Sequence, residues 1–97
     1  MADVFHALSS PVRRQILAML KARDMTAGEI SDQLDVGKST LSGHFNVLKA
    51  ADLVTAERNG TTITYSLNTS VVEDMLALMA GIFGKEEKGA RNNDGEV

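Results

Sequence analysis

The chain has 97 residues, the size of one domain, and 43% of them are hydrophobic, as in an ordinary globular protein. Its net charge of −3 counts against a protein that is basic overall, so any affinity for DNA must come from a local group of Lys and Arg side chains. The absence of cysteine excludes disulfides and thiolate metal sites. No long apolar run and no secretory signal is visible, so we expect a cytoplasmic protein without membrane insertion.

The first quarter of the chain predicts two helices. Residues 2–8 place Val4, Phe5 and Leu8 on one face of a short helix. Ser10 is a good N-cap and Pro11 suits the first helical position, so a second helix is expected from residue 11 to about 22. The apolar stripe of this second helix consists of Val12, Ile16, Met19 and Leu20, and its basic residues Arg13, Arg14 and Lys21 lie off that stripe.

After a connector at residues 23–25, residues 26–50 predict two short helices with a tight break at 35–37. Thr26 and Glu29 have the spacing of a capping box, which begins the first of them. The second starts near residue 37 or 38, and Leu41, Phe45 and Leu48 form its apolar face. Its opposite face carries Lys38, Ser39, Ser42, Gly43, Asn46 and Lys49. A helix that is packed on one side and presents short hydrogen-bonding side chains on the other suits the major groove of DNA.

The next segment predicts a β-hairpin. Residues 54–58 and 61–67 have the character of strands, and Asn59–Gly60 between them indicates a type I′ turn, in which both central residues need positive φ. Because a two-stranded hairpin is marginal alone, we expect it to pack on the helices.

A last helix is expected from about residue 71 to 83, with a capping box at Ser70 and Glu73 and a stop at Gly84. It carries two adjoining apolar stripes, one more than a single core needs, so the second stripe calls for a partner. A second copy is the natural partner, because so short a chain buries little surface alone. Residues 85–97 are polar and without period, which predicts a disordered tail after a domain at 1–84.

The predicted order of elements, α-α-α-α-β-β-α, is that of a mainly α winged helix-turn-helix with a small β-hairpin. The stretches FHALSSPVRRQIL, the segment around LSGHFNVLKAADLV, and RNGTTITYSL resemble the ArsR family of transcriptional repressors over residues 2–84. Within that family the chain is similar to metal-independent autorepressors found beside small toxin-immunity operons. The resemblance implies a homodimer, joined through its first and last helices, that binds an imperfect inverted repeat in double-stranded DNA.

These arguments define two sets of candidate residues. The expected DNA-binding set is Lys38, Ser39, Thr40, Ser42, Gly43, His44, Asn46 and Lys49 in the recognition helix and Arg58, Asn59, Gly60 and Thr61 in the wing. The expected dimerisation set is Val4, Phe5, Leu8, Val72, Met75, Leu76, Met79, Ile82 and Phe83. His44 either contacts DNA or holds the recognition helix in place. Arg13 and Arg14 lie near the expected DNA backbone, although one of them can instead pair with an acid such as Glu57.

Departures from the family pattern predict that no metal or other cofactor is used. Metal-sensing members carry a cysteine pair before the recognition helix, or Asp and His on the last helix, and neither set is present here. An enzyme is disfavoured because the chain has no phosphate loop, triad or metal cluster. The alternative function is a winged helix that binds only protein, which is favoured if Asp32, Asp35 and Asp52 dominate the recognition surface. The operator and any effector or sequestering partner remain open.

Overall fold

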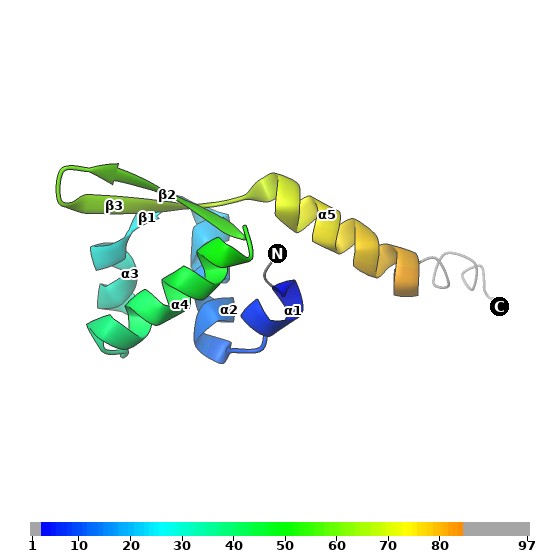
Figure 1. Ribbon diagram of the computed structural model, residues 1–97, viewed down its shortest axis with the longest axis horizontal. Coiled ribbons are helices and arrows are strands. Elements are labelled where there is room, and N and C mark those ends of the chain that lie inside the picture. The colour runs from blue at the N-terminus through cyan, green and yellow to red at the C-terminus, as the bar shows by residue number, and fades with distance from the viewer. Residues whose placement is uncertain (1–2, 85–97) are drawn as a thin grey trace.

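A computed structural model describes residues 3–84 and has a helical body, a small sheet along one side of it, and a last helix that extends beyond it (Figure 1). The elements are α1 (Val4–Ala7), α2 (Pro11–Ala22), β1 (Met25–Thr26), α3 (Ala27–Gln33), α4 (Lys38–Ala50), β2 (Val54–Asn59), β3 (Thr62–Leu67), α5 (Thr69–Met79) and a π-helical turn, η1 (Ala80–Gly84). The predicted order of helices and hairpin is confirmed. Among residues 3–84, no helix is long and apolar enough to cross a bilayer.

The sheet contains one strand that the sequence did not predict. Met25 and Thr26, expected to be a connector and a helix cap, pair antiparallel with Tyr65 and Thr64, so that the strand order is β1-β3-β2. Met25 is buried at 3% exposure because its side chain enters the core. This third strand fastens the hairpin to the helices, which a two-stranded ribbon needs for stability.

The hairpin turn lies one residue further along the chain than predicted. Asn59 pairs with Thr62 as the last residue of β2, so the two central residues of the turn are Gly60 and Thr61. Gly60 has a φ of +62°, whereas Asn59 and Thr61 keep negative φ. Positive φ at the first central position alone is the pattern of a type II′ turn, so the type I′ prediction is wrong. The glycine takes the left-handed conformation because it has no Cβ to clash there.

The capping box that begins α3 is confirmed. The Thr26 hydroxyl accepts from the backbone N–H of Glu29 at 3.1 Å, and the Glu29 carboxylate accepts from the N–H of Thr26 at 2.9 Å. This backbone N–H, together with the Arg23 guanidinium, lowers the pKa of the Glu29 carboxyl from its usual 4.5. The contribution of the carboxylate to stability is therefore present above the pKa of the unfolded chain and is lost as the pH falls through the folded pKa.

We expect Thr26→Ala to lower the free energy of unfolding by about 1 kcal/mol, because it removes the side-chain cap of α3. Urea denaturation monitored by circular dichroism measures the change. Thr69→Ala is the matched control, since Thr69 is exposed at the start of α5 and the cap there is Asn68. Equal losses for the two variants would contradict the role of the capping box.

The end of α4 is closed by a motif that the sequence did not reveal. The N–H of Leu53 donates to the carbonyl of Leu48, and the N–H of Asp52 donates to that of Lys49. Asp52 adopts a φ of +61°. These are the two hydrogen bonds and the left-handed residue of a Schellman motif, here with Asp where Gly is usual. The motif turns the chain sharply from α4 into β2.

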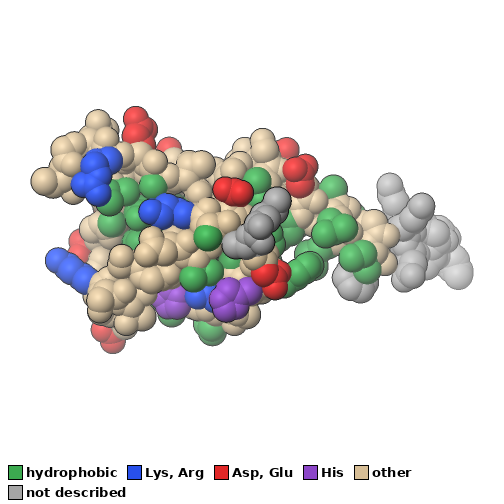
Figure 2. Space-filling view, in the orientation of Figure 1, with side chains coloured by type: hydrophobic (Ala, Val, Ile, Leu, Met, Phe, Trp, Pro, Cys, Tyr) green, Lys and Arg blue, Asp and Glu red, His purple; other side chains and the backbone are tan. Residues whose placement is uncertain are grey.

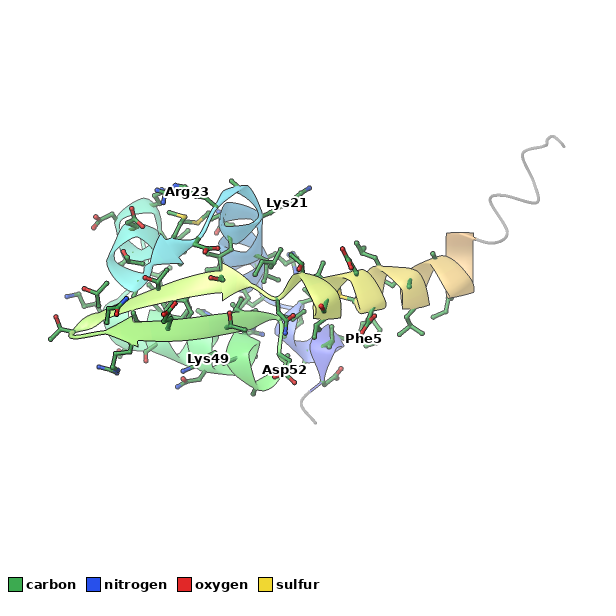
Figure 3. All side chains as sticks on the ribbon, turned by 90° about the horizontal axis from the view of Figure 1, so that it is seen from above. Phe5, Lys21, Arg23, Lys49 and Asp52 are labelled. Atoms are coloured by element: carbon green, nitrogen blue, oxygen red, sulfur yellow. The ribbon has the colours of Figure 1, made fainter. Side chains whose placement is uncertain are left out.

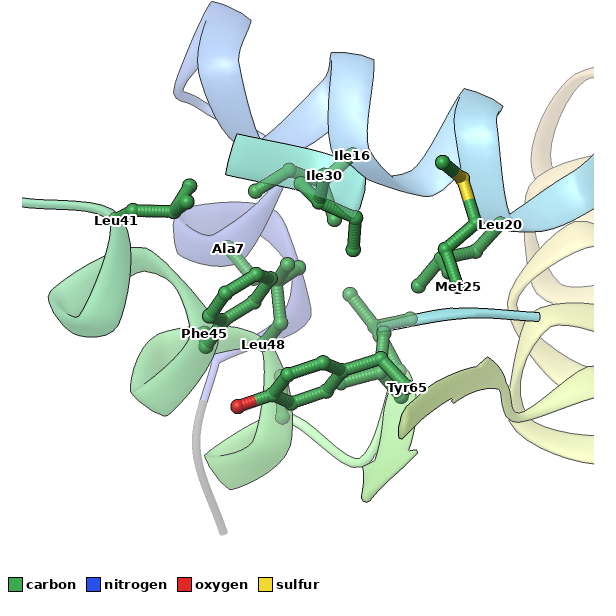
Figure 4. Packing of buried hydrophobic residues seen from close by; sticks show 12 residues of the cluster. Ala7, Ile16, Leu20, Met25, Ile30, Leu41, Phe45, Leu48 and Tyr65 are labelled. Atoms are coloured by element: carbon green, nitrogen blue, oxygen red, sulfur yellow. The ribbon is translucent and has the colours of Figure 1, made fainter. Parts of the chain in front are cut away.

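The hydrophobic core lies between α2, α3, α4 and the sheet (Figure 4). Its fully buried members include Ile16, Ile30, Leu48 and Leu53. The predicted apolar face of α4 is confirmed, since Leu41, Phe45 and Leu48 are all buried. The recognition helix is thereby held from one side only.

Helix α5 begins two residues earlier than predicted and ends earlier too. Its N-cap is Asn68, whose side-chain oxygen accepts from the N–H of Val71, so the capping box predicted at Ser70 is wrong. Asn68 is as good a cap as Ser70 and comes first in the chain, which places Ser70 inside the first turn. Regular α-helix ends at Met79 and continues as η1. The tail predicted at 85–97 lies outside the described residues.

Candidate nucleic-acid interface

The face of α4 that points away from the core is uncovered. Within residues 3–84, nothing packs over its small and polar side chains. The exposed members of the predicted set on this helix are Lys38, Ser39, Thr40, Ser42, Gly43, Asn46 and Lys49. A Cβ built on Gly43 meets no atom within 4 Å, so the backbone here is open to close approach by another molecule.

An aromatic stack fixes α4 against the hairpin. The rings of Phe45 and Tyr65 lie with their centroids 4.1 Å apart and their planes at 16°. Both residues are buried, and they join the middle of α4 to the middle of β3. A stacked pair of this kind holds the two elements in one relative orientation. The exposed face of α4 and the wing are therefore presented as one rigid surface.

The predicted wing residues gather at the tip of the hairpin. Arg58, Asn59, Gly60 and Thr61 are all exposed and lie at or beside the turn. The strand β2 is exposed from Thr55 onward, so the distal hairpin projects from the body (Figure 1).

Basic side chains lie around this surface. In Figure 2 the Lys and Arg side chains sit over the hairpin and α4 half of the molecule, and several Asp and Glu side chains are visible there too, one of them on the hairpin, where Glu57 is exposed on β2. Lys38, Lys49 and Arg58 are exposed and form no ion pair with any residue between 3 and 84. Asp32, Asp35 and Asp52 are also exposed, but they belong to α3, the α3–α4 loop and the end of α4. The recognition surface thus combines neutral hydrogen-bonding groups with unpaired cations.

Arg13 does not lie on this surface, contrary to the sequence analysis. It is only 7% exposed, and its guanidinium donates to the carbonyls of Ala7 at 2.7 Å and His6 at 2.9 Å. The third guanidinium nitrogen of Arg13 lies 3.0 Å from Nδ1 of His44. Because an arginine can only donate, Nδ1 of His44 must be the acceptor, and the ring carries its proton on Nε2. The predicted pairing with Glu57 is absent.

This arrangement agrees with the second of the two roles expected for His44, which is to hold the recognition helix in place. Its ring is half-buried and links the middle of α4, through Arg13, to the last turn of α1. The two carbonyls at the end of α1 are a favourable site for a cation, because the last carbonyls of a helix carry partial negative charge. Sequence reasoning missed the contact because it joins residues 31 positions apart. Arg14 stays exposed and donates to the carbonyl of Leu8.

We expect Arg13→Met to lower the free energy of unfolding by about 3 kcal/mol, because it leaves two carbonyls and a ring nitrogen without their donor. Chemical denaturation measures this loss. Arg14→Met is the matched control, and its expected cost is within about 1 kcal/mol because the side chain is exposed. A cost for Arg13→Met no larger than that of the control would show that the network has no structural role.

A second exposed surface lies on α5 and α1, and it is apolar. Phe5, Leu76, Leu78 and Ile82 are 51–56% exposed. Val4 and Phe5 of α1 face Met75 and Leu78 of α5 across a cavity of about 290 Å³. From above, α5 passes beyond the rest of the fold, with Phe5 beside its first turns (Figure 3).

The other predicted dimerisation residues are less exposed. Val4, Leu8 and Val72 are half-buried and pack against the core, and Met75 and Met79 are also half-buried. The side chain of Phe83 lies outside the described part of the structure.

The chain is similar to helix-turn-helix domains and to named transcriptional regulators. A family model described as a helix-turn-helix domain matches residues 8–57. The transcriptional repressor SdpR of Bacillus subtilis is 44% identical over 85 residues, which are 88% of this chain and 94% of that protein. The structure of HlyU from Vibrio cholerae is 30% identical, with a TM-score of 0.69 over 82% of this chain and 87% of that one.

An ArsR-like transcriptional regulator from Rhodococcus sp. RHA1 is 26% identical, with a TM-score of 0.76 over 92% of this chain and 82% of that one. The helix-turn-helix match spans α2 to α4, the other likenesses cover 82–92% of the chain, and they agree with the exposed recognition helix and wing described above. They confirm the resemblance found in the sequence. The chain belongs to the ArsR family of winged helix-turn-helix proteins and is a DNA-binding transcriptional regulator.

Proposed function

We propose that the protein is a dimeric repressor that binds an inverted-repeat operator through α4 and the wing and excludes other proteins from the promoter. The observation that carries this proposal is the exposed, polar and cationic face of α4, fixed from behind by the core and the Phe45–Tyr65 stack. The repressor activity rests on the similarity to SdpR, whose name describes a transcriptional repressor. The proposal places the protein in the cytoplasm, where a regulator of transcription meets its DNA.

Each part of the surface suits a different part of the DNA. Asn46 can form paired hydrogen bonds with adenine in the major groove, while Ser39, Thr40 and Ser42 are tolerant donors and acceptors. Lys38 and Lys49 suit phosphates at the two ends of the helix. No side chain caps the start of α4, so its first N–H groups are also open to a phosphate. Arg58 at the wing suits a phosphate or the minor groove.

The dimer supplies the second half of the contact. A monomer with so few cations binds DNA weakly, because affinity grows with the number of neutralised phosphates. The exposed apolar residues of α5 and α1 are the surface that a second copy covers in this proposal. Two recognition helices then enter successive major grooves about 34 Å apart.

The proposal includes neither catalysis nor a metal. Among residues 3–84, no three His, Cys, Asp or Glu side chains are grouped so that they could hold a metal ion. The relatives compared above are named as transcriptional regulators, a repressor for SdpR and an activator for HlyU. A winged helix that binds only protein is not favoured, because the recognition face carries Lys38 and Lys49 and no acidic side chain between them.

The experiment that tests the proposal is selection of bound fragments from the source genome, followed by fluorescence anisotropy on the selected duplex. We expect one or a few fragments, each with an imperfect inverted repeat. Enrichment of no sequence above random fragments would contradict specific DNA binding.

Two variants separate base recognition from phosphate binding. We expect Asn46→Ala to weaken binding to the selected operator by about tenfold to a hundredfold and to leave random duplexes nearly unaffected. Lys49→Ala should weaken both and should reduce the slope of log affinity against log salt by about 1 for each copy. If Asn46→Ala weakened both duplexes equally, Asn46 would not read a base.

A further inference from the structure

A cavity of about 310 Å³ lies beneath the proposed DNA-binding surface, between the start of α3, the helix α4 and the strand β3. Leu41 and Phe45 of α4 and Ile63 and Tyr65 of β3 form its apolar wall. Figure 4 shows three of these side chains at the edge of the core. The volume is within the range of small-molecule sites, which are commonly apolar with a few convergent polar groups.

Three side chains at this cavity, those of Lys38, Ser42 and Tyr65, can donate a hydrogen bond, and one of them is buried without a partner in the described part of the chain. Tyr65 is only 4% exposed, yet its hydroxyl forms no hydrogen bond with any residue between 3 and 84. Its oxygen is at the end of the ring that points toward α4 in Figure 4. A phenol is protonated at neutral pH, and burial raises the pKa of this one further. The exposed side chains of Lys38 and Ser42 lie at the same cavity.

This combination selects one class of ligand. An ammonium and two hydroxyls favour an anion with acceptor oxygens, and the residues that line the cavity include no carboxylate to repel it. The apolar wall favours a hydrocarbon body. A phosphate without a hydrocarbon part would leave the apolar wall in contact with water. A neutral hydrocarbon would leave the hydrogen-bond donors without an acceptor.

We propose that this cavity is an effector site for a small organic acid, with its carboxylate toward Lys38 and the hydroxyls and its apolar body against Leu41, Phe45 and Ile63. Such an acid releases the protein from its operator, because it neutralises a cation and occupies space at the surface that faces DNA. This effect rests on the proposed function of α4. By linkage, DNA lowers the affinity for the acid by the same factor as the acid lowers the affinity for DNA.

Benzoate is the probe, and the full-length protein without DNA is titrated first. Methyl and amide NMR signals should shift saturably at Leu41, Ser42 and Ile63. Benzamide has the ring without the charge, and acetate has the charge without the ring, so each should bind at least about tenfold more weakly. Absence of a saturable shift with benzoate, or equal affinity for the three compounds, overturns the site.

Tyr65→Phe removes the hydroxyl and keeps the ring stack, so benzoate affinity should fall about tenfold while the operator affinity measured without benzoate stays unchanged. If Tyr65→Phe fails to fold, Lys38→Met is used instead. This variant should bind benzoate more weakly than the wild type does, whereas its affinity for benzamide should be unchanged. If Tyr65→Phe and Lys38→Met both fold and both bind benzoate as tightly as the wild type, the proposed orientation of the ligand is wrong.

The second titration is made with the operator duplex. Benzoate should raise the dissociation constant for DNA, and acetate at the same concentration should not, which excludes a salt effect. Bound benzoate that leaves DNA affinity unchanged overturns the effector role. Failure of the free protein to bind any operator would instead count against the proposed function, and the titration without DNA would still judge the cavity.

Discussion

Ser42→Glu is expected to abolish operator binding without unfolding the protein. Ser42 is exposed at the second turn of α4, so a glutamate there costs the fold little. On the complex, its carboxylate would face the negative groove of DNA, and like-charge contacts of this kind cost several kcal/mol. A loss of about 4 kcal/mol corresponds to roughly a thousandfold in affinity.

The measurement is a gel-shift titration on the selected operator, together with a thermal denaturation of the free protein. Ser70→Glu is the matched control, because Ser70 is an exposed serine in the first turn of α5. That variant changes the net charge equally and should keep nearly full affinity. Unchanged binding by Ser42→Glu would remove α4 from the recognition surface, and equal losses in both variants would indicate a general charge effect.

Leu76→Glu is expected to convert the protein to monomers. The helix α5 has two adjoining apolar stripes, and Leu76 lies in one of them at 56% exposure. In a dimer that covers this face, the substitution would bury an unpaired carboxylate, which costs several kcal/mol for each copy. Operator affinity should then fall toward that of a single recognition helix on a half-site.

Analytical ultracentrifugation measures the oligomeric state, and Ala77→Glu is the control. Residue 77 is one position away, but it lies outside the apolar stripes, about 100° round the helix from Leu76 and on the polar side with Glu73 and Asp74. The control should remain a dimer. A Leu76→Glu protein that sediments as the wild type does would move the dimer surface away from α5.

The sequence predicted the elements that have strong local signals. Thr26 and Glu29 mark the start of α3, and the spacing of Leu41, Phe45 and Leu48 gives both the helix α4 and the face that it buries. Where two local signals compete, the prediction was less accurate. Asn68 and Ser70 are both good caps, and Gly60 alone takes the positive φ that the sequence also offered to Asn59.

What the sequence could not supply was the set of contacts between distant segments. The strand at Met25 forms only because β3 pairs with it, and two residues carry no detectable period. The burial of Arg13 depends on three acceptors from α1 and α4. The candidate site shows the same division. The exposed face of α4 followed from periodicity, whereas the Phe45–Tyr65 stack and the cavity beside it needed the three-dimensional structure.

The contacts of Arg13 also bear on how a signal between subunits would travel. The end of α1 and the middle of α4 share one guanidinium, so neither can tilt without stretching hydrogen bonds of 2.7–3.0 Å. Helix α1 supplies Val4 and Phe5 to the apolar cavity beside α5. A molecule that enters this cavity and displaces α1 would therefore also move α4, because Arg13 couples the two helices directly, without a flexible segment in between.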